Sequence, residues 1–192
     1  MQKWMQHWAL VVLIGGSVCG WISSANADEA PAATELSLAE GKIQFKAPGN
    51  WTKKKPANNI IEAEFSIAPA EGDEIPGRLT AMGAGGEIEA NIERWKGQFT
   101  AAPGGDVLAK KETLQIADQK VHWVDLSGTY KDSPGGPFAG GKTIMREKYR
   151  MLGVIIETKK AGNYFLKFYG PQATVTANEK AFRSMVESLS VK

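Results

Sequence analysis

Alternating apolar and polar side chains predict a series of β-strands along this chain. From residue 61 to 67 the odd positions are apolar and the even positions polar, which is typical of a strand that is buried on one face. Similar runs predict strands over residues 43–47, 78–83, 110–116, 119–130, 149–158 and 164–169. Tight turns at Ala117-Asp118 and at Lys160 to Asn163 separate neighbouring runs, so we expect hairpins there.

Two segments change to a helical period. Ile88, Ile92, Trp95 and Phe99 follow one another at spacings of four, three and four residues, so they form one apolar stripe of a helix. Residues 176–179 (TANE) have the sequence of a capping box and predict the start of a second helix. An apolar stripe continues from there to the end of the chain.

These elements predict an α+β fold. Strands that are joined by short turns pair antiparallel, whereas parallel neighbours need a long crossover. We therefore expect one antiparallel β-sheet of about six to seven strands with two main helices packed on it. Both helices are expected to cover a single sheet face, which would carry Phe65, Ile67, Val124, Leu126 and Ile155 or Ile156. Three tryptophans are assigned to the core: Trp51, Trp95 and Trp123.

The first residues have the pattern of a cleavable export signal. Lys3 precedes an apolar run of about 14 residues, shorter than the roughly 20 that a spanning helix needs, and Ala25-Asn26-Ala27 forms an A-x-A site. The sequence thus predicts a signal peptide over 1–27, a disordered lead-in over 28–35 and one domain over 36–192. An uncleaved membrane anchor is the alternative, and a lipoprotein anchored at Cys19 ranks below both.

Composition then narrows the possible chemistry. The single cysteine, Cys19, lies in the signal, so the mature chain would lack disulfides, thiol nucleophiles and thiolate metal sites. The net charge of the chain is +2, and removal of residues 1–27 takes away one base, Lys3, and no acid. This balance gives no electrostatic footprint for nucleic acid. We predict no cofactor, and no transmembrane segment in the mature chain.

One loop is rich in glycine and proline. Residues 136–143 (GPFAGGKT) match the P-loop pattern, but Pro137 removes a backbone amide that would bind phosphate, and a helix should follow the loop. We interpret the segment as a flexible hairpin loop with an apolar aromatic residue, Phe138, near its tip. Its candidate contacts to a protein partner in the cell envelope are Pro134, Gly135, Gly136, Pro137, Phe138, Gly140, Gly141 and Lys142.

A second candidate contact is basic. Lys53, Lys54 and Lys55 follow Trp51 and form the only run of three bases in the chain. Such a run attracts an anionic surface, although only modestly. The alternative interpretation is a solvated turn.

Catalytic and metal signatures are sparse. His122 and Asp125 are three residues apart on a predicted strand, so they face opposite sides of the sheet. No G-x-S-x-G motif is present, and one mature histidine without cysteine is too few for a structural zinc site. The acids of residues 71–74 lack the spacing of an EF-hand and are interpreted as a solvated loop, which leaves a weak calcium site open.

Three features of the chain form a recognisable pattern: residues 45–51 (FKAPGNW), the helix that follows the third strand, and residues 164–171 (YFLKFYGP) with the helix after them. In these features the chain resembles the PsbP-like superfamily, which includes the extrinsic photosystem II subunit and bacterial DcrB-type envelope proteins. It covers most of residues 36–191 and also extends to uncharacterised exported bacterial proteins. The resemblance implies an antiparallel sheet between helices and a non-catalytic binding or assembly role, and no site residue is transferred from it.

Two classes of function remain open at this point. The first is an exported, non-catalytic binding or accessory protein of the bacterial cell envelope. The alternative is a small periplasmic hydrolase that uses His122 and carboxylates, which predicts that His122 and an acid converge in a cleft. A His122 buried with Val124 and Leu126 would contradict the hydrolase.

Overall fold

A computed structural model describes residues 31–56, 58–101, 107–133 and 142–192, and it confirms the α+β class. The strands are β1 (Thr34–Leu38), β2 (Ile43–Ala47), β3 (Thr52–Lys54), β4 (Ala63–Ile67), β5 (Gly77–Gly83), β6 (Phe99–Thr100), β7 (Leu108–Ile116), β8 (Gln119–Asp132), β9 (Ile144–Thr158), β10 (Gly162–Pro171) and β11 (Ser190–Val191). The helices are η1 (Ala39–Gly41), α1 (Ile88–Lys96) and α2 (Gln172–Glu187).

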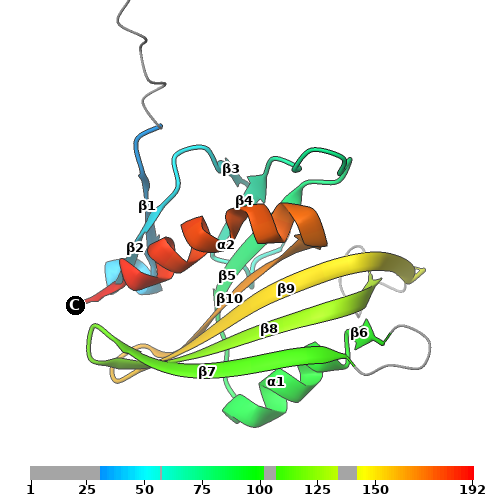
Figure 1. Cartoon of the computed structure of the whole chain (residues 1–192). Helices are drawn as coiled ribbons and strands as arrows, with labels where there is room; N and C mark the ends of the chain where they lie inside the picture. Colours follow the sequence, from blue (N-terminus) through cyan, green and yellow to red (C-terminus); the bar gives the residue numbers. More distant parts are fainter. Residues whose placement is uncertain (1–30, 57, 102–106, 134–141) are drawn as a thin grey trace, which may run out of the picture.

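An eight-stranded antiparallel sheet forms the centre of the molecule (Figure 1). Its strands follow the order β3-β4-β5-β10-β9-β8-β6, and β7 also pairs with β8. A separate three-stranded sheet has the order β1-β2-β11. The structure is therefore richer in strands than the six to seven that we predicted. The expected hairpins at residues 117–118 and 160–163 are confirmed, and Ala117 and Asp118 both adopt positive φ angles, as a tight two-residue turn requires.

The two helices cover opposite faces of the large sheet, so the prediction of a single covered face is wrong (Figure 1). Helix α2 buries Phe182 beside Phe65, Ile67 and Trp123. Helix α1 buries Trp95 on the other face, together with Val124, Leu126, Ile155 and Phe165. Consecutive residues of a strand point to opposite faces of the sheet. The alternation within one strand does not show which of its residues share a face with those of the next strand, so the sequence alone could not assign the two faces. All three tryptophans assigned to the core are buried.

The beginning of α2 also differs from the prediction. The helix starts at Gln172, directly after β10, rather than at the expected capping box. Asp73 accepts hydrogen bonds from the backbone N–H and the hydroxyl of Thr174, at 2.9 and 2.6 Å, so it satisfies a donor of the first helical turn. Thr176 and Glu179 are consequently free to bind a side chain of the sheet.

Two element boundaries differ by a few residues from those predicted from the sequence. Strand β1 begins at Thr34, inside the lead-in expected for residues 28–35, because it pairs with β2 in the small sheet. Helix α1 ends at Lys96, and Phe99 belongs to β6, where it pairs with Tyr130. Phe99 is nevertheless buried on the α1 face, so the predicted apolar stripe describes its burial correctly.

Candidate functional site

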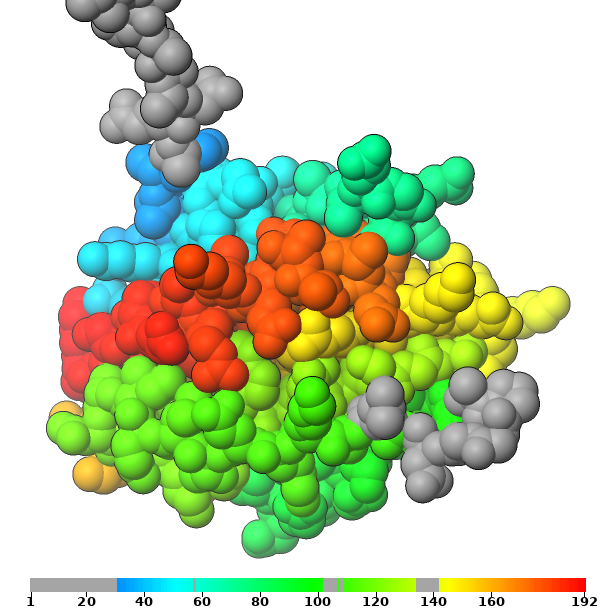
Figure 2. All heavy atoms as spheres, viewed as in Figure 1, coloured from blue at the N-terminus to red at the C-terminus, as the bar shows by residue number. Residues whose placement is uncertain are grey.

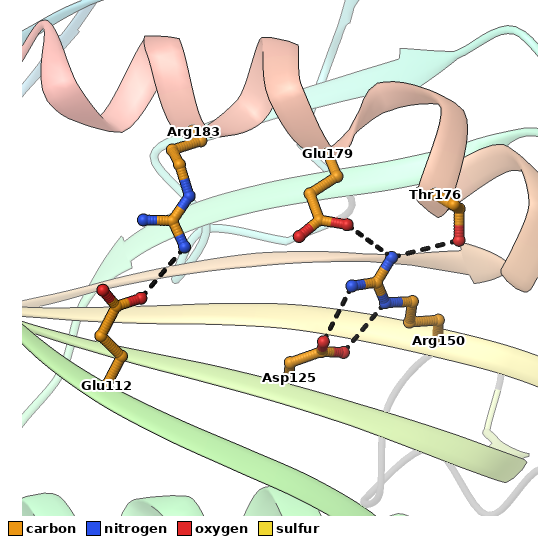
Figure 3. A network of polar contacts seen from close by, with 6 residues as sticks. All are labelled: Glu112, Asp125, Arg150, Thr176, Glu179 and Arg183. Carbon is orange, nitrogen blue, oxygen red and sulfur yellow. Dashed lines mark hydrogen bonds and ion pairs between the residues drawn. The ribbon is translucent and has the colours of Figure 1, made fainter.

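A network of ion pairs connects α2 to the large sheet (Figure 3). Arg150 on β9 donates two hydrogen bonds to Asp125 on β8, at 2.9 and 2.8 Å. Its remaining terminal nitrogen lies 2.8 Å from a carboxylate oxygen of Glu179 and 3.1 Å from the hydroxyl oxygen of Thr176. Arg183 makes a second pair with Glu112 at 3.0 Å, and its guanidinium lies over the ring of Trp123.

This network lines a shallow groove between α2 and strands β7 to β9. Two adjoining hollows of about 200 and 440 Å³ share Lys110, Asp125 and Arg150 in their walls. The hydrogen bonds to Asp125 raise the pKa of Arg150 above its ordinary value, so its positive charge is permanent. Since both arginines are paired with carboxylates, these ion pairs fasten α2 to the sheet.

The α1 face carries a different polar group, the lysine–tyrosine cluster, formed by Gln98, Tyr130, Tyr149, Lys167 and Tyr169. The amine of Lys167 donates to the amide oxygen of Gln98 at 2.6 Å and to the phenol oxygen of Tyr130 at 3.0 Å. It also lies 4.9 Å from the centre of the Tyr130 ring and 4.5 Å from that of Tyr169. Tyr149 stacks on Tyr130 at 5.9 Å. Among the described residues no carboxylate pairs with Lys167.

Burial changes the acid–base behaviour of this cluster. It lowers the pKa of Lys167 to about 7, and it raises the pKa of Tyr130, Tyr149 and Tyr169 above their ordinary values. The cluster was missed at the level of sequence, although one signal was present. Lys167 is the only charged residue in the run 164–169, whose other members are aromatic or apolar.

His122 has a partner that its sequence position did not indicate. Its Nε2 lies 2.5 Å from a carboxylate oxygen of Glu157 on β9, and this hydrogen bond lowers the pKa of Glu157. The imidazole shares the α1 face with Val124 and Leu126, and its side chain is 15 % exposed. Thr113 is the residue opposite His122 on β7, but in the described ranges no hydrogen bond joins the two. A histidine and an acid thus converge without an activated hydroxyl nucleophile.

The candidate interaction loop falls almost wholly outside the described residues, since only Lys142 of its proposed contacts is described, and it is exposed. The flanking strands can be placed. Lys142 is followed after one residue by Ile144 and Met145, which are 39 % and 52 % exposed. Strand β9 begins at Ile144, so the helix that a P-loop requires after its Gly-Lys-Thr sequence is replaced by a strand.

The basic run has a clear position in the fold. Lys53 and Lys54 lie on β3, an edge strand of the large sheet, and Lys55 follows it; all three are exposed. Lysines on an edge strand hinder pairing with other chains, so this location explains them without a ligand. The structure does not bring them near the lysine–tyrosine cluster, from which they are separated by β4 and β5.

The described residues contain neither a metal-binding cluster nor a membrane-spanning helix. These residues contain no group of three histidine, cysteine or acidic side chains that is arranged to hold a metal ion. Asp73, one of the acids considered for calcium, caps α2. No helix in this part of the chain is long and apolar enough to cross a membrane.

Comparison with known proteins places the fold. Neither a protein family nor a curated protein sequence matches the chain. The solved structure of CyanoP, the PsbP of Synechocystis sp. PCC 6803, aligns with 90 % of this chain and 100 % of that protein at a TM-score of 0.51 and 13 % identity. The fold is PsbP-like. LpqN of Mycobacterium tuberculosis, a protein involved in cell envelope biogenesis, aligns with 83 % of this chain and 90 % of its own at a TM-score of 0.48 and 11 % identity. A PsbP-like fold at such identities does not by itself assign a function.

Proposed function

We propose that this chain is an exported, non-catalytic binding or accessory protein of the bacterial cell envelope, and that its protein partner docks at the end of the β8–β9 hairpin. The observation that carries the proposal is the exposure of two adjacent apolar residues, Ile144 and Met145, at this end. Export is supported by the signal-peptide pattern of residues 1–27.

The start of β9 offers a partner more than apolar contacts. Residues 144–146 pair with β8 on one side, whereas β10 joins the other side only from Tyr149 onward. No other described strand pairs with this edge over residues 144–148. Unpaired backbone N–H and C=O groups on such an edge can bind an extended segment of another protein as an added strand. In Figure 2 the yellow start of β9 projects at the right-hand margin of the molecule, accessible from outside.

The proposed contact extends into the glycine-rich loop predicted from the sequence. Lys142 closes that loop and is exposed beside Thr143 and Ile144. An aromatic residue at the loop tip, Phe138, would add apolar area to that of Ile144 and Met145, and aromatic residues are enriched in protein–protein interfaces. The glycine and proline content of residues 134–142 supports a loop at this position.

Site-specific photo-crosslinking in the native envelope tests this proposal. A benzophenone amino acid at position 145 should capture a discrete partner, and the same probe at position 60 should not. Ile60 is a matched control because it is an apolar residue with still higher exposure, 69 % against 52 % for Met145.

A charge-introducing variant completes the test. Ile144→Asp combined with Met145→Asp should abolish capture by a probe placed at Lys142, whereas Ile60→Asp should leave it intact. The proposal fails if positions 60 and 145 capture the same proteins, or if neither captures any.

A further inference from the structure

Lys167 lies on β10, a strand inside the large sheet, between the buried residues Leu166 and Phe168. It is half-buried, and its amine is held by one amide oxygen, from Gln98, and one phenol oxygen, from Tyr130. Both acceptors are neutral. A buried ammonium normally has a carboxylate partner, because loss of its hydration must be offset. Lys167 has none among the described residues, so its protonated form is poorly stabilised.

Charged groups act on this amine in both directions. Arg78 on β5 and Arg94 on α1 disfavour a further positive charge, whereas Asp132 on β8 favours it. Arg78 is itself paired with Glu64 at 2.8 Å. Asp132 is itself paired with Arg146 at 3.2 Å. The phenols that face the amine, those of Tyr130 and Tyr169, are neutral at pH 7 because burial raises their pKa. With a pKa lowered to about 7, roughly half of the Lys167 side chains are unprotonated at neutral pH.

Tyr130 supplies a proton donor next to this amine. Its oxygen lies 3.0 Å from the lysine nitrogen, and its ring is buried and fixed by stacking on Tyr149. The phenol oxygen of Tyr169, by contrast, accepts a hydrogen bond from Arg78 at 2.7 Å and is directed away, toward β5. Desolvation and neighbouring cations are the two devices by which proteins activate lysine amines toward carbonyl carbon, and both operate here.

We propose that Lys167 is a reactive amine that binds small aldehydes covalently as an imine, with Tyr130 as the proton donor. The nitrogen lone pair forms a bond to the carbonyl carbon, and the electron pair of the C=O π bond moves to oxygen, which takes the phenol proton of Tyr130. The resulting carbinolamine loses water as the C=N bond forms, and Tyr130 recovers a proton from the nitrogen. The net change is amine plus aldehyde to imine plus water, which requires no oxidant or reductant.

The position of Lys167 restricts the ligand to small molecules. The Lys167 residue is half-buried, and the rings of Tyr130 and Tyr169 lie on two sides of its amine, so an aldehyde has to be small to reach the nitrogen. Large aldehydes would have to displace these rings. This activity does not depend on the proposed docking at the β8–β9 hairpin, because trapping is measured on the purified protein without a partner.

The experiment is reductive trapping of the purified protein with acetaldehyde and cyanoborohydride at pH 7, with mass spectrometry of each lysine-containing peptide. Exposed lysines with ordinary pKa values are almost fully protonated at this pH, so Lys167 should be ethylated at least ~10 times faster than any of them. Its rate should reach half-maximum near pH 7. Labelling of Lys167 that is no faster than that of exposed Lys53 overturns the proposal.

Two tyrosine variants test the proton donor. Tyr130→Phe keeps the ring but removes the hydroxyl that lies beside the amine, and it should slow imine formation by about 10-fold or more. Tyr149→Phe is the matched control, because it belongs to the same cluster and stacks on Tyr130. Equal rates in the two variants would remove Tyr130 from the mechanism.

Discussion

Arg150 and Lys167 are half-buried cations on neighbouring strands of one sheet, yet they lie on opposite faces and in opposite surroundings. Arg150 faces α2 and is paired with Asp125 and Glu179. Lys167 faces α1, and within the described ranges its hydrogen bonds go to the neutral groups of Gln98 and Tyr130. Their pKa values accordingly move in opposite directions, upward for the arginine and downward for the lysine.

The two cations therefore differ in role: Arg150 stabilises the fold through its ion pairs, whereas the amine of Lys167 is available to react. Asp125 and Glu179 replace the water that Arg150 loses, so this arginine fastens α2 without a proton to give. Lys167 has two neutral acceptors and two aromatic rings in place of that water, and no carboxylate among the described residues, so burial disfavours its ammonium form. Violations of a local rule that persist in a folded protein concentrate at functional sites. The α1 face is therefore the place where we expect chemistry.

Removal of a counter-charge on the α2 face should have the largest effect on stability. In Asp125→Ala, Arg150 keeps the hydroxyl of Thr176 and one carboxylate, that of Glu179, whose side chain is 38 % exposed and stabilises the cation less well. We expect the free energy of unfolding to fall by ~3 kcal/mol, as when one partner of a buried pair is removed. Urea denaturation measures the change.

The matched control is the second pair on the same face. In Glu112→Ala the lost partner is 47 % exposed and serves Arg183, which also rests on Trp123. A loss of ~0.5 kcal/mol or less is expected for such a surface pair. Equal losses in the two variants would mean that the Arg150 network does not fasten α2.

Replacing the cation on the α1 face should have a smaller effect of the opposite sign. Between pH 7 and 10.5 the unfolded chain holds the Lys167 proton more tightly than the folded chain, so the native protein gains stability as pH rises through this window. Lys167→Met removes the titrating group. We expect it to increase the free energy of unfolding at pH 7 by about 1–2 kcal/mol. The gain is limited to this size because the methionine cannot make the two hydrogen bonds of the lysine.

The pH dependence provides the sharper measurement. The stability difference between Lys167→Met and the native protein should shrink from pH 7 to pH 10.5, because the folded lysine is already neutral while the unfolded one loses half of its protons by the upper end. Urea denaturation across this range detects the trend. A constant difference would show that Lys167 is charged in the folded protein throughout, and the contrast with Arg150 would disappear.

Sequence patterns predicted the long elements of this fold and missed the short ones. Strand β9 spans 15 residues and α2 spans 16, so their periods are unmistakable. Strands β3, β6 and β11 have two or three residues and exist only because β4, β8 and β2 pair with them. The same limitation explains the error about the helices, since the faces of a sheet are matched by pairing between strands.

For the candidate sites too, the sequence showed features that lie within one segment and missed contacts between residues far apart in the chain. The sequence predicts a glycine-rich loop between β8 and β9, and the described residues that follow it, Ile144 and Met145, are exposed. The Arg150 network joins residues of β8, β9 and α2, and no local pattern reports it. Lys167 was visible as a lone charge in an apolar strand, but its lack of a counter-charge depends on what α1 and β8 place beside it.

The smallest predicted effect tests whether α1 helps to set the chemistry of Lys167. Arg94 is exposed and donates to the neutral amide oxygen of Asn91 at 2.7 Å, a contact that does not neutralise its charge. Arg94→Gln should raise the pKa of Lys167 by a few tenths of a pH unit, measured by NMR of the labelled lysine side chains, and high salt should weaken the difference. Arg183→Gln, on the α2 face, is the control, since its charge is paired with Glu112 across the sheet. An equal response to both variants would mean that Lys167 senses only the net charge of the protein, whereas a response to Arg94 alone would show that α1 holds the lysine in its reactive form.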